Sequence, residues 1–452
     1  MLEENERLAD LVTLGDLRTQ AAALWPRRPE KASAMRHWLG QARGLVDRLP
    51  DHEAALQRIR QEAFLSQVVG GVIEESDSSE IVWEKLDAKL RWRLENFSRL
   101  IEDLRGMKDL IGDVAARLEV AETIKQRTVD EHAEEWEDAI ADIAESDTYG
   151  GPELEPQVGL VPLEPDPDSE LWEFWVWETG ERPERDDETG RWITAAETGM
   201  VLVLLRGGTF WMGAQKDNPN EPNYEAEAMD DESPVHQVAL RPFLLSKYEM
   251  TQAQWQRVIG SNPSYYDEGD SGGPTHPVEN VDWSMCTDTC GRIGLILPTE
   301  AQWEYACRAG TDTVWWTGGD SRTLEGAANL FDRESLVRNP EISAWGTPMP
   351  WVDPYTGHAP VGSFRPNGFG FHDTCGNVWE WCLDWYGPYR LRHRENDGLL
   401  QVPEDAECPR ANRGGSFDYV ASLARSADRN YCTPDFNSRN VGCRPAARVI
   451  TE

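Results

Sequence analysis

The sequence predicts an α+β protein in two parts, a helical region followed by a domain of short strands, few helices and irregular loops. Two observations support this division. Leucines recur at helical spacings through the first third of the 452 residues, and few Pro or Gly interrupt them. From Met200 onward Trp, Gly, Pro and Asn become frequent and the apolar runs become short. We therefore expect a helical domain at 1–148, an acidic connection with a hairpin at 149–199 and a second domain at 200–452.

The clearest helical periodicity runs from Ile81 to Ala144. Apolar side chains alternate there with Glu, Lys and Arg, and the pattern resumes after Gly106. Such a pattern is typical of a long helical hairpin or a coiled-coil-like pair. Two interpretations of the helical region remain open, a docking or oligomerisation module and a plain helical bundle.

The connection between the two parts is rich in Pro, Glu and Asp. The stretch from Gly150 to Ser169 predicts a linker or an extended segment that lies along the next domain. Two β-prone runs follow, LWEFWVW at 171–177 and RWITAAETGMVLVLL at 191–205, separated by a polar turn. They predict a hairpin that leads into the second domain.

Two helices in the second domain have clear start signals. Thr251 comes just before the helix-like sequence AQWQRVIG (253–260). Thr299 is followed three residues later by Gln302. A threonine at this position can cap a helix, and a Gln three residues later completes a capping box. The rest of this domain is expected to be held together by aromatic packing and irregular loops. Such a domain needs additional stabilisation, which favours bound ions.

The net charge of −37, from 81 acidic and 44 basic residues, excludes several partners. Phosphate binding needs clustered Lys and Arg, so nucleic acid and anionic membrane surfaces are not expected. No apolar run approaches the roughly 18 residues of a membrane span, and the acidic start differs from a signal peptide. We expect a cytoplasmic protein whose acidity serves solubility or the capture of a basic protein partner.

Eight cysteines lie between residues 286 and 443. In a reducing cytoplasm they are expected to be free and buried rather than bridged. Cys286 and Cys290 are four residues apart on an expected helix, and no CxxC spacing indicates zinc.

A series of motifs in the second domain resembles the formylglycine-generating-enzyme, or sulfatase-modifying factor, domain family from Gly207 to Val449. The motifs occur in the family's order. They are GGTFWMG (207–213), SPVHQVAL (233–240), YEMTQAQW (248–255), HPVENVDW (276–283), LPTEAQWEYACRAGT (297–311), HAPVGSFRPNGFGFHDTCGNVWEWCLDWY (358–386), NRGGSF (412–417) and RNVGCRPA (439–446).

The resemblance implies an irregular, C-type-lectin-like fold that structural calcium stabilises. One implied site uses the side chains of Asn329 and Asp353 with backbone oxygens of Leu330 and Tyr355. The other uses Asp373 and Glu380 with backbone oxygens of Gly376 and Val378. Calcium takes six to eight oxygen ligands, and carboxylates mixed with loop carbonyls are a usual source of them.

The sequence departs from the family at its active centre. Formylglycine formation uses two cysteines shortly after the GGS motif, which bind copper(I) and the substrate thiol. Tyr419 and Ala424 occupy those positions here. Copper(I) prefers soft thiolate ligands, so we expect neither copper nor sulfatase activation, and we treat the chain as a binding protein rather than an enzyme.

A second enzymatic branch of the family uses a three-histidine iron site in a fused helical domain. The N-terminal region here offers His37, His52 and His132, without the His-x3-His spacing of that branch. Isolated histidines on helices are usually solvated, so an iron site is not expected.

The segment that follows GGSF, residues 418–443, is dense in Asp, Tyr, Asn, Ser and Arg. In this family it lines the groove that holds peptide, and its composition resembles an antibody paratope. We expect a protein or peptide ligand on the groove around Phe417–Asn440. The residues expected to form it are Arg413, Ser416, Tyr419, Arg425, Arg429, Tyr431 and Phe436. Gly414 and Gly415 allow either close approach of a ligand or a turn that the fold requires, and Trp379, Trp381 and Trp385 are expected in the core.

Three alternatives remain open. The first is a receptor diversified by a retroelement. The segment at 418–443 lacks Lys, Glu, Gln, Met and Trp, and these are residues that adenine-directed mutation of AAY codons cannot produce. An acidic regulatory partner that sequesters a signalling protein is the second. An enzyme of different chemistry, with Asp418, Tyr419 and His372 as acid and base, is the third. The region before the domain also resembles the connector of bacterial Ser/Thr kinase fusions, without the kinase motifs, which favours a role in bacterial signalling or defence.

Overall fold

A computed structural model describes residues 2–70, 81–151, 154–267, 272–338, 347–401 and 408–450, with side chains described from residue 9 onward except that of residue 338. The chain forms two compact units, Met1–Ile124 and Lys125–Glu452. This division lies upstream of the boundary expected at residue 148. Residues 152 and 153 of the expected linker lie outside the described residues.

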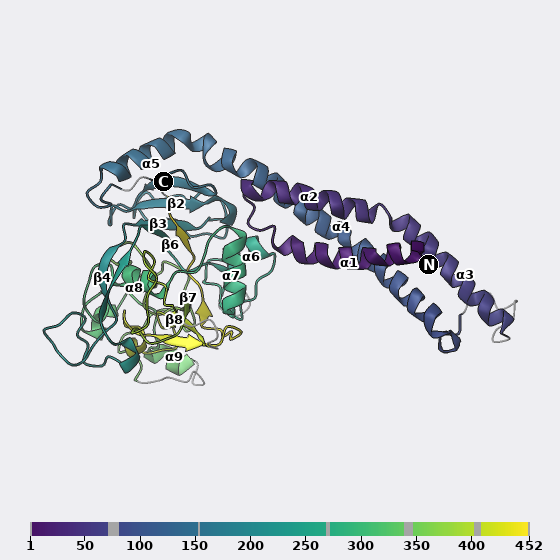
Figure 1. Cartoon of the computed structure of the whole chain (residues 1–452). Helices are drawn as coiled ribbons and strands as arrows, with labels where there is room; N and C mark the ends of the chain where they lie inside the picture. The colour runs from purple at the N-terminus through teal and green to yellow at the C-terminus, as the bar shows by residue number, and fades with distance from the viewer. Residues whose placement is uncertain are drawn as a thin grey trace. The chain divides into compact units, whose positions relative to one another are not determined.

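Within the described residues, the first unit consists of long helices (Figure 1). Leu104 and Met107 of the last helix pack with leucines of the first two helices, and Phe97 packs against the third. The helices are α1 (Leu2–Ala22), α2 (Pro29–Val46), α3 (Leu49–Val69) and α4 (Ala88–Thr128), which follows a 3-10 turn at Trp83–Lys85 and extends just beyond the first unit.

The hairpin expected between Ile81 and Ala144 is wrong, because α4 is one continuous helix of 41 residues. Asp87 begins it by accepting the backbone N–H groups of Lys89 and Leu90 at 2.9 Å. Gly106 does not break the helix, since a single glycine costs only about 1 kcal/mol. The buried side chains on both sides of it hold the backbone helical.

The expectation of solvated histidines is wrong for His52. His37 is exposed and His132 is half-buried beside Glu135, at 3.1 Å. His52 is only 1% exposed, and its Nε2 lies 3.0 Å from Oδ2 of Asp10. A carboxylate partner makes it possible to bury the ring.

A five-stranded antiparallel sheet organises the second unit, in the order β1–β2–β3–β6–β11. Its strands are β1 (Leu160–Pro165), β2 (Trp172–Val176), β3 (Val201–Leu205), β6 (Phe243–Ser246) and β11 (Ala446–Arg448). The expected hairpin strands are present as β2 and β3. Helix α5 (Ala133–Glu145) lies over this sheet (Figure 1) and contributes Trp136 and Ile143 to its core.

A buried lysine after β6 connects this strand to β2 and to the turn that follows β1. Lys247 follows β6, and its Nζ lies 2.6 Å from Asp166 Oδ2 and 2.7 Å from Glu173 Oε1. Glu173 also accepts a hydrogen bond from Arg185 at 2.7 Å. Part of the expected connection is therefore an ordered component of the second unit.

The other strands form two smaller sheets. One has the order β10–β7–β8–β9, with β10 parallel to β7, and the other pairs β4 with β5. Trp379 and Trp381 of β7 are buried, as predicted, and Trp385 is half-buried against Arg410. These strands are β4 (Gly208–Met212), β5 (His236–Leu240), β7 (Trp379–Trp385), β8 (Arg410–Arg413), β9 (Asn430–Cys432) and β10 (Val441–Gly442).

Both predicted helix starts are confirmed. Thr251 with Gln254 and Thr299 with Gln302 form complete capping boxes. The helices of this part are α6 (Gln252–Ile259), α7 (Trp283–Arg292), α8 (Glu300–Arg308) and α9 (Arg333–Arg338). The eight cysteines are free, and six of them are buried. No helix among the described residues is both long and apolar enough to cross a membrane.

Candidate functional site

The segment expected to bind a ligand begins at a tight turn after β8. Gly414 and Gly415 have φ angles of 102° and 77°. A Cβ atom on Gly415 would lie 2.8 Å from the carbonyl oxygen of Leu423, so a larger residue would clash with the backbone. The glycine pair therefore serves the turn that the fold requires.

The two positions at which the family resemblance leads us to expect thiols are occupied by packing groups. The ring of Tyr419 meets that of Trp379 edge-on, with centroids 5.6 Å apart. Ala424 is completely buried in a core cluster that includes Trp303 and Trp315. Neither side chain offers a soft ligand to a metal.

Two of the arginines expected on the binding surface are buried and share one carboxylate. Arg429 donates from Nε and Nη2 to the two oxygens of Glu300 at 2.6 and 2.7 Å. Arg413 donates to Glu304 at 2.5 Å and to Glu300 at 3.3 Å. Burial of an arginine requires such partners, and here helix α8 supplies them. Arg413 is completely buried, and its assignment to a contact surface is corrected. Arg429 is 6% exposed and also lines a hollow beside Tyr386.

Arg425 and Ser416 are also buried. Arg425 donates to Glu225 at 2.7 Å and to Glu232 at 2.6 Å, carboxylates from a segment 200 and 193 residues earlier. Ser416 donates to Asp418 at 2.6 Å. No local pattern reveals these partners, so the paratope-like composition of the segment concealed an internal polar network.

Tyr431 and Phe436 remain as exposed predicted residues, at 53% and 41%, whereas Tyr419 is half-buried. The Tyr431 ring lies on that of Tyr386, with centroids 4.5 Å apart. Tyr386 also lines a hollow of about 390 Å³ beside Asp230, Asp231, Arg390 and Arg429. We call this hollow together with Tyr386 and Tyr431 the Tyr431 face, and Phe436 follows Tyr431 by five residues in the sequence. The sequence did not reveal Tyr386 as a surface residue, because it ends a motif otherwise rich in core tryptophans.

The first expected calcium site has an unpartnered carboxylate oxygen. Asp353 Oδ1 accepts the N–H of Tyr355 at 2.8 Å, while no donor among the described residues reaches its buried Oδ2. Burial raises the pKa of Asp353 to about 6. Asn329 donates to the carbonyl oxygen of Gly357, at 3.0 Å, and so faces the same loop. Leu330 is buried beside Asn329. These groups fit a cation that prefers oxygen ligands.

The second expected site fits less well, because its glutamate already has partners. Both oxygens of Glu380 accept hydrogen bonds from Arg444, and one accepts from Trp303 at 2.6 Å. Asp373 keeps its Oδ1 without a donor among the described residues, and burial raises its pKa to about 6. Gly376 approaches Asn329 closely, and the Val378 N–H donates to Glu249 at 3.1 Å.

Within the described residues, no group of three or more His, Cys, Asp or Glu side chains is placed to hold a metal ion. Any ion at the two expected sites would therefore depend on backbone carbonyl and amide oxygens as well as carboxylates. Calcium commonly uses such mixed ligand sets, whereas zinc and copper prefer nitrogen and sulfur.

The acid–base set proposed for an enzyme is poorly suited to catalysis. His372 is 2% exposed, its Nδ1 lies 2.7 Å from the carbonyl oxygen of Phe364, and burial lowers its pKa to about 3. Asp418 accepts from Ser416 and from Asn440, at 2.6 and 3.0 Å. A buried, weakly basic imidazole cannot readily take a proton from a ligand at neutral pH.

Residues 192–449 match the family model of the sulfatase-modifying factor enzyme 1-like domain. A formylglycine-generating enzyme of Streptomyces coelicolor is 30% identical over 297 residues, which span 54% of this chain and 88% of that enzyme. The serine/threonine-protein kinase pkn1 of Chlamydia pneumoniae is 28% identical over 274 residues, which span 55% of this chain and 38% of the kinase. The structure of Treponema denticola variable protein 1 aligns with a TM-score of 0.43 and 21% identity, over 57% of this chain and 98% of that protein.

Proposed function

Because the chain belongs to the sulfatase-modifying factor enzyme 1-like domain family, we propose that it is a non-catalytic member that binds a basic protein or peptide through the Tyr431 face. One observation carries the proposal. Tyr419 and Ala424 stand at the positions of the thiol pair, and Ala424 is completely buried. The copper chemistry of the family's enzymes has no ligands there.

The Tyr431 face has the features of a recognition surface. Tyrosine supplies a large amphipathic contact area at a low cost in conformational entropy, and it is frequent at the energetic centres of interfaces. The ring of Tyr386 beneath Tyr431 is itself fixed over the guanidinium of Arg429, 4.6 Å from the ring centroid. The exposed aromatic group therefore rests on a rigid, ion-paired base.

Charge favours a basic partner. Two acidic residues, Asp230 and Asp231, and two basic residues, Arg390 and Arg429, line the hollow. The preference for a basic partner therefore comes from the net charge of −37 of the whole chain. A field of this sign attracts cationic partners and repels anionic ones. Partial similarity to a serine/threonine-protein kinase, over 38% of its length, motivates the further proposal that the partner belongs to a bacterial signalling or defence system.

We also propose calcium as a structural ion at Asn329 and Asp353 with the carbonyl oxygens of Leu330 and Tyr355. The buried Oδ2 of Asp353, without a donor among the described residues, supports this site. A bound cation would satisfy this oxygen and favour the ionised carboxylate.

Selection of displayed peptides on the full-length protein tests the binding function. The affinities of the peptides enriched on the wild type are then measured by calorimetry for the wild type and for the variants Tyr431→Ala and Phe436→Ala. We expect basic peptides whose affinity falls at least tenfold in Tyr431→Ala, as for a central aromatic contact. Tyr224→Ala, which removes an exposed tyrosine of another segment (37% exposed), serves as the control. Equal binding by wild type and both variants would contradict the proposal.

A further inference from the structure

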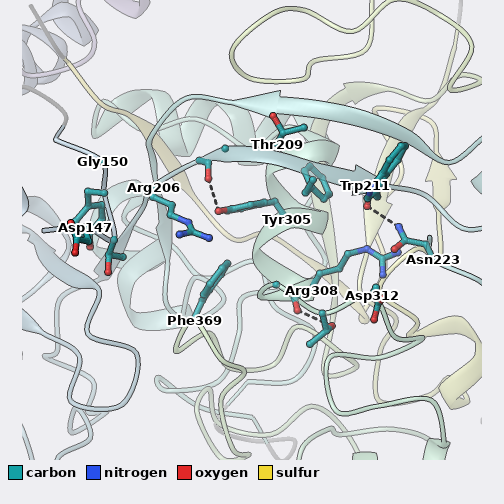
Figure 2. Close-up of a pocket in the computed structure, with 17 residues that line it drawn as sticks. Asp147, Gly150, Arg206, Thr209, Trp211, Asn223, Tyr305, Arg308, Asp312 and Phe369 are labelled. Carbon is teal, nitrogen blue, oxygen red and sulfur yellow. Dashed lines mark hydrogen bonds between the residues drawn. The ribbon is translucent and has the colours of Figure 1, made fainter. Parts of the chain in front are cut away.

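A second and larger cavity, of about 780 Å³, lies in the second unit and shares no lining residue with the hollow of the Tyr431 face. Its walls come from the turn after α5, the start of β4 and the C-terminal end of α8 with its following loop. Cavities of this size are in the range of small-molecule sites. Figure 2 shows Arg206 extending into this space near Tyr305 and Phe369. We call it the Arg206 cavity.

Arg206 is an exposed cation for which the described residues provide no ion pair or side-chain hydrogen bond. The other arginine of the cavity differs from it. Arg308 is 3% exposed and donates to Glu304 at 2.8 Å and to the carbonyl oxygen of Gly213 at 3.1 Å. Arg308 is thus part of the wall, whereas the five N–H donors of Arg206 are available to a ligand.

Three aromatic rings form an apolar wall beside this cation. The centroid of the Tyr305 ring lies 5.4 Å from that of Phe210 and 5.6 Å from that of Phe369. The Tyr305 hydroxyl donates to the carbonyl oxygen of Gly207 at 2.6 Å, which fixes the ring in place. The wall is therefore ordered before any ligand arrives, which reduces the entropic cost of binding.

We propose that the Arg206 cavity binds a small organic acid with one carboxylate and an aromatic ring. The carboxylate would accept two parallel hydrogen bonds from the guanidinium, and the ring would pack against Phe210, Tyr305 and Phe369. Asp147 and Asp312 are exposed and line the same cavity. Their charges disfavour a ligand with several negative groups, so a monocarboxylate fits better than a phosphate.

Calorimetry on the full-length protein with 3-phenylpropionate tests this proposal. We expect 3-phenylpropionate to bind with a millimolar or lower Kd. Binding of 3-phenylpropionamide, which lacks the charge, and of propionate, which lacks the ring, should each be at least tenfold weaker. Arg206→Gln should weaken binding of 3-phenylpropionate about tenfold, the usual consequence of losing a charge-assisted pair. Phe369→Leu should weaken it severalfold while retaining an apolar side chain.

Arg241→Gln is the matched control, since Arg241 is exposed in the same unit and does not line the cavity. Its affinity for 3-phenylpropionate should equal that of the wild type. Because Arg206 is exposed, its substitution should leave the melting temperature unchanged, and this is measured first. Absence of binding at 20 mM ligand, or equal binding of the acid and the amide, or unchanged binding by Arg206→Gln, would each overturn the proposal.

Discussion

Arg429 and Glu300 form a buried ion pair in which two guanidinium nitrogens donate to the two carboxylate oxygens at 2.6 and 2.7 Å. Glu300 is also the first residue of α8, and Arg413 contacts it from β8. The segment expected to face a ligand is therefore attached to the interior by its arginines, and its exposed aromatic rings remain free to contact a partner.

This pair predicts that Arg429 acts on stability. Arg429→Ala leaves Glu300 with a buried charge whose main partner is lost, so we expect a loss of about 3–5 kcal/mol in the free energy of unfolding. Tyr431→Ala should change stability by no more than about 0.5 kcal/mol, as is usual at exposed positions. Urea denaturation followed by circular dichroism measures both. A stable Arg429→Ala variant that loses only peptide binding would restore Arg429 to the contact surface.

Calcium is expected to stabilise the second unit through Asp353. At a concentration one hundred times its Kd, calcium should add about 2.7 kcal/mol to the free energy of unfolding. Asp353→Asn should remove this increment without lowering the stability of the metal-free protein, because the buried carboxylate is gone. Melting temperatures with calcium and with EGTA provide the measurement, and Asp217→Asn, an exposed change, is the control. An undiminished calcium effect in Asp353→Asn would refute the site.

Copper(I) should not bind stoichiometrically to the native protein. Tyr419 and Ala424 provide no thiolate, and Cys286, Cys290 and Cys443 are buried. Competition with a chromophoric copper(I) chelator measures the bound fraction. The urea-unfolded chain, with its eight accessible thiols, is the positive control and should take copper from the chelator. Capture of one equivalent by the native protein would contradict this prediction and would direct attention to the thiols of Cys286, Cys290 and Cys443, which contact one another.

Asp384 should make stability depend on pH. Burial and the nearby Glu300 carboxylate raise its pKa to about 7, while hydrogen bonds from the backbone N–H groups of Leu400 and Glu300, and the charge of Arg429, oppose them. Since the folded pKa lies above the ordinary 3.8, the folded state binds the proton more tightly. The contribution of this proton to the free energy of unfolding is complete below about pH 4 and is lost as the pH rises through about 7. Wild type should therefore lose stability relative to Asp384→Asn over this interval, whereas Asp288→Asn should track the wild type. Parallel profiles for wild type and Asp384→Asn would exclude the effect.

The sequence predicted those features that depend on local signals or on the ordered motifs. The capping boxes at Thr251 and Thr299 are confirmed, because each is complete within four residues. The family and its fold class are confirmed, because the motifs of the second unit retain the family's order. The hairpin in the first unit was wrong, because Gly106 is too weak a signal to end a helix whose neighbouring residues are buried.

The candidate site could be predicted only in part, since burial of a polar side chain depends on distant partners. Arg425 pairs with Glu225 across 200 residues, and nothing within the segment distinguishes it from an exposed arginine. Tyr386 and Arg206 were overlooked for the converse reason. Tyr386 follows a run of core residues and Arg206 follows a buried strand, yet both side chains are accessible to solvent. The calcium ligands stay predictions, with Asp353 better supported than Glu380.

The ion pairs of Lys247 determine where an expressible fragment can begin. The family match starts at residue 192, but both carboxylates that neutralise Lys247, on Asp166 and Glu173, precede it. A fragment cut at that point would remove both carboxylate partners of the Lys247 ammonium and leave the edge of β3 open to strands of other molecules. Recombinant work on the second unit should therefore retain α5 and the two strands after it, since a shorter piece is expected to precipitate.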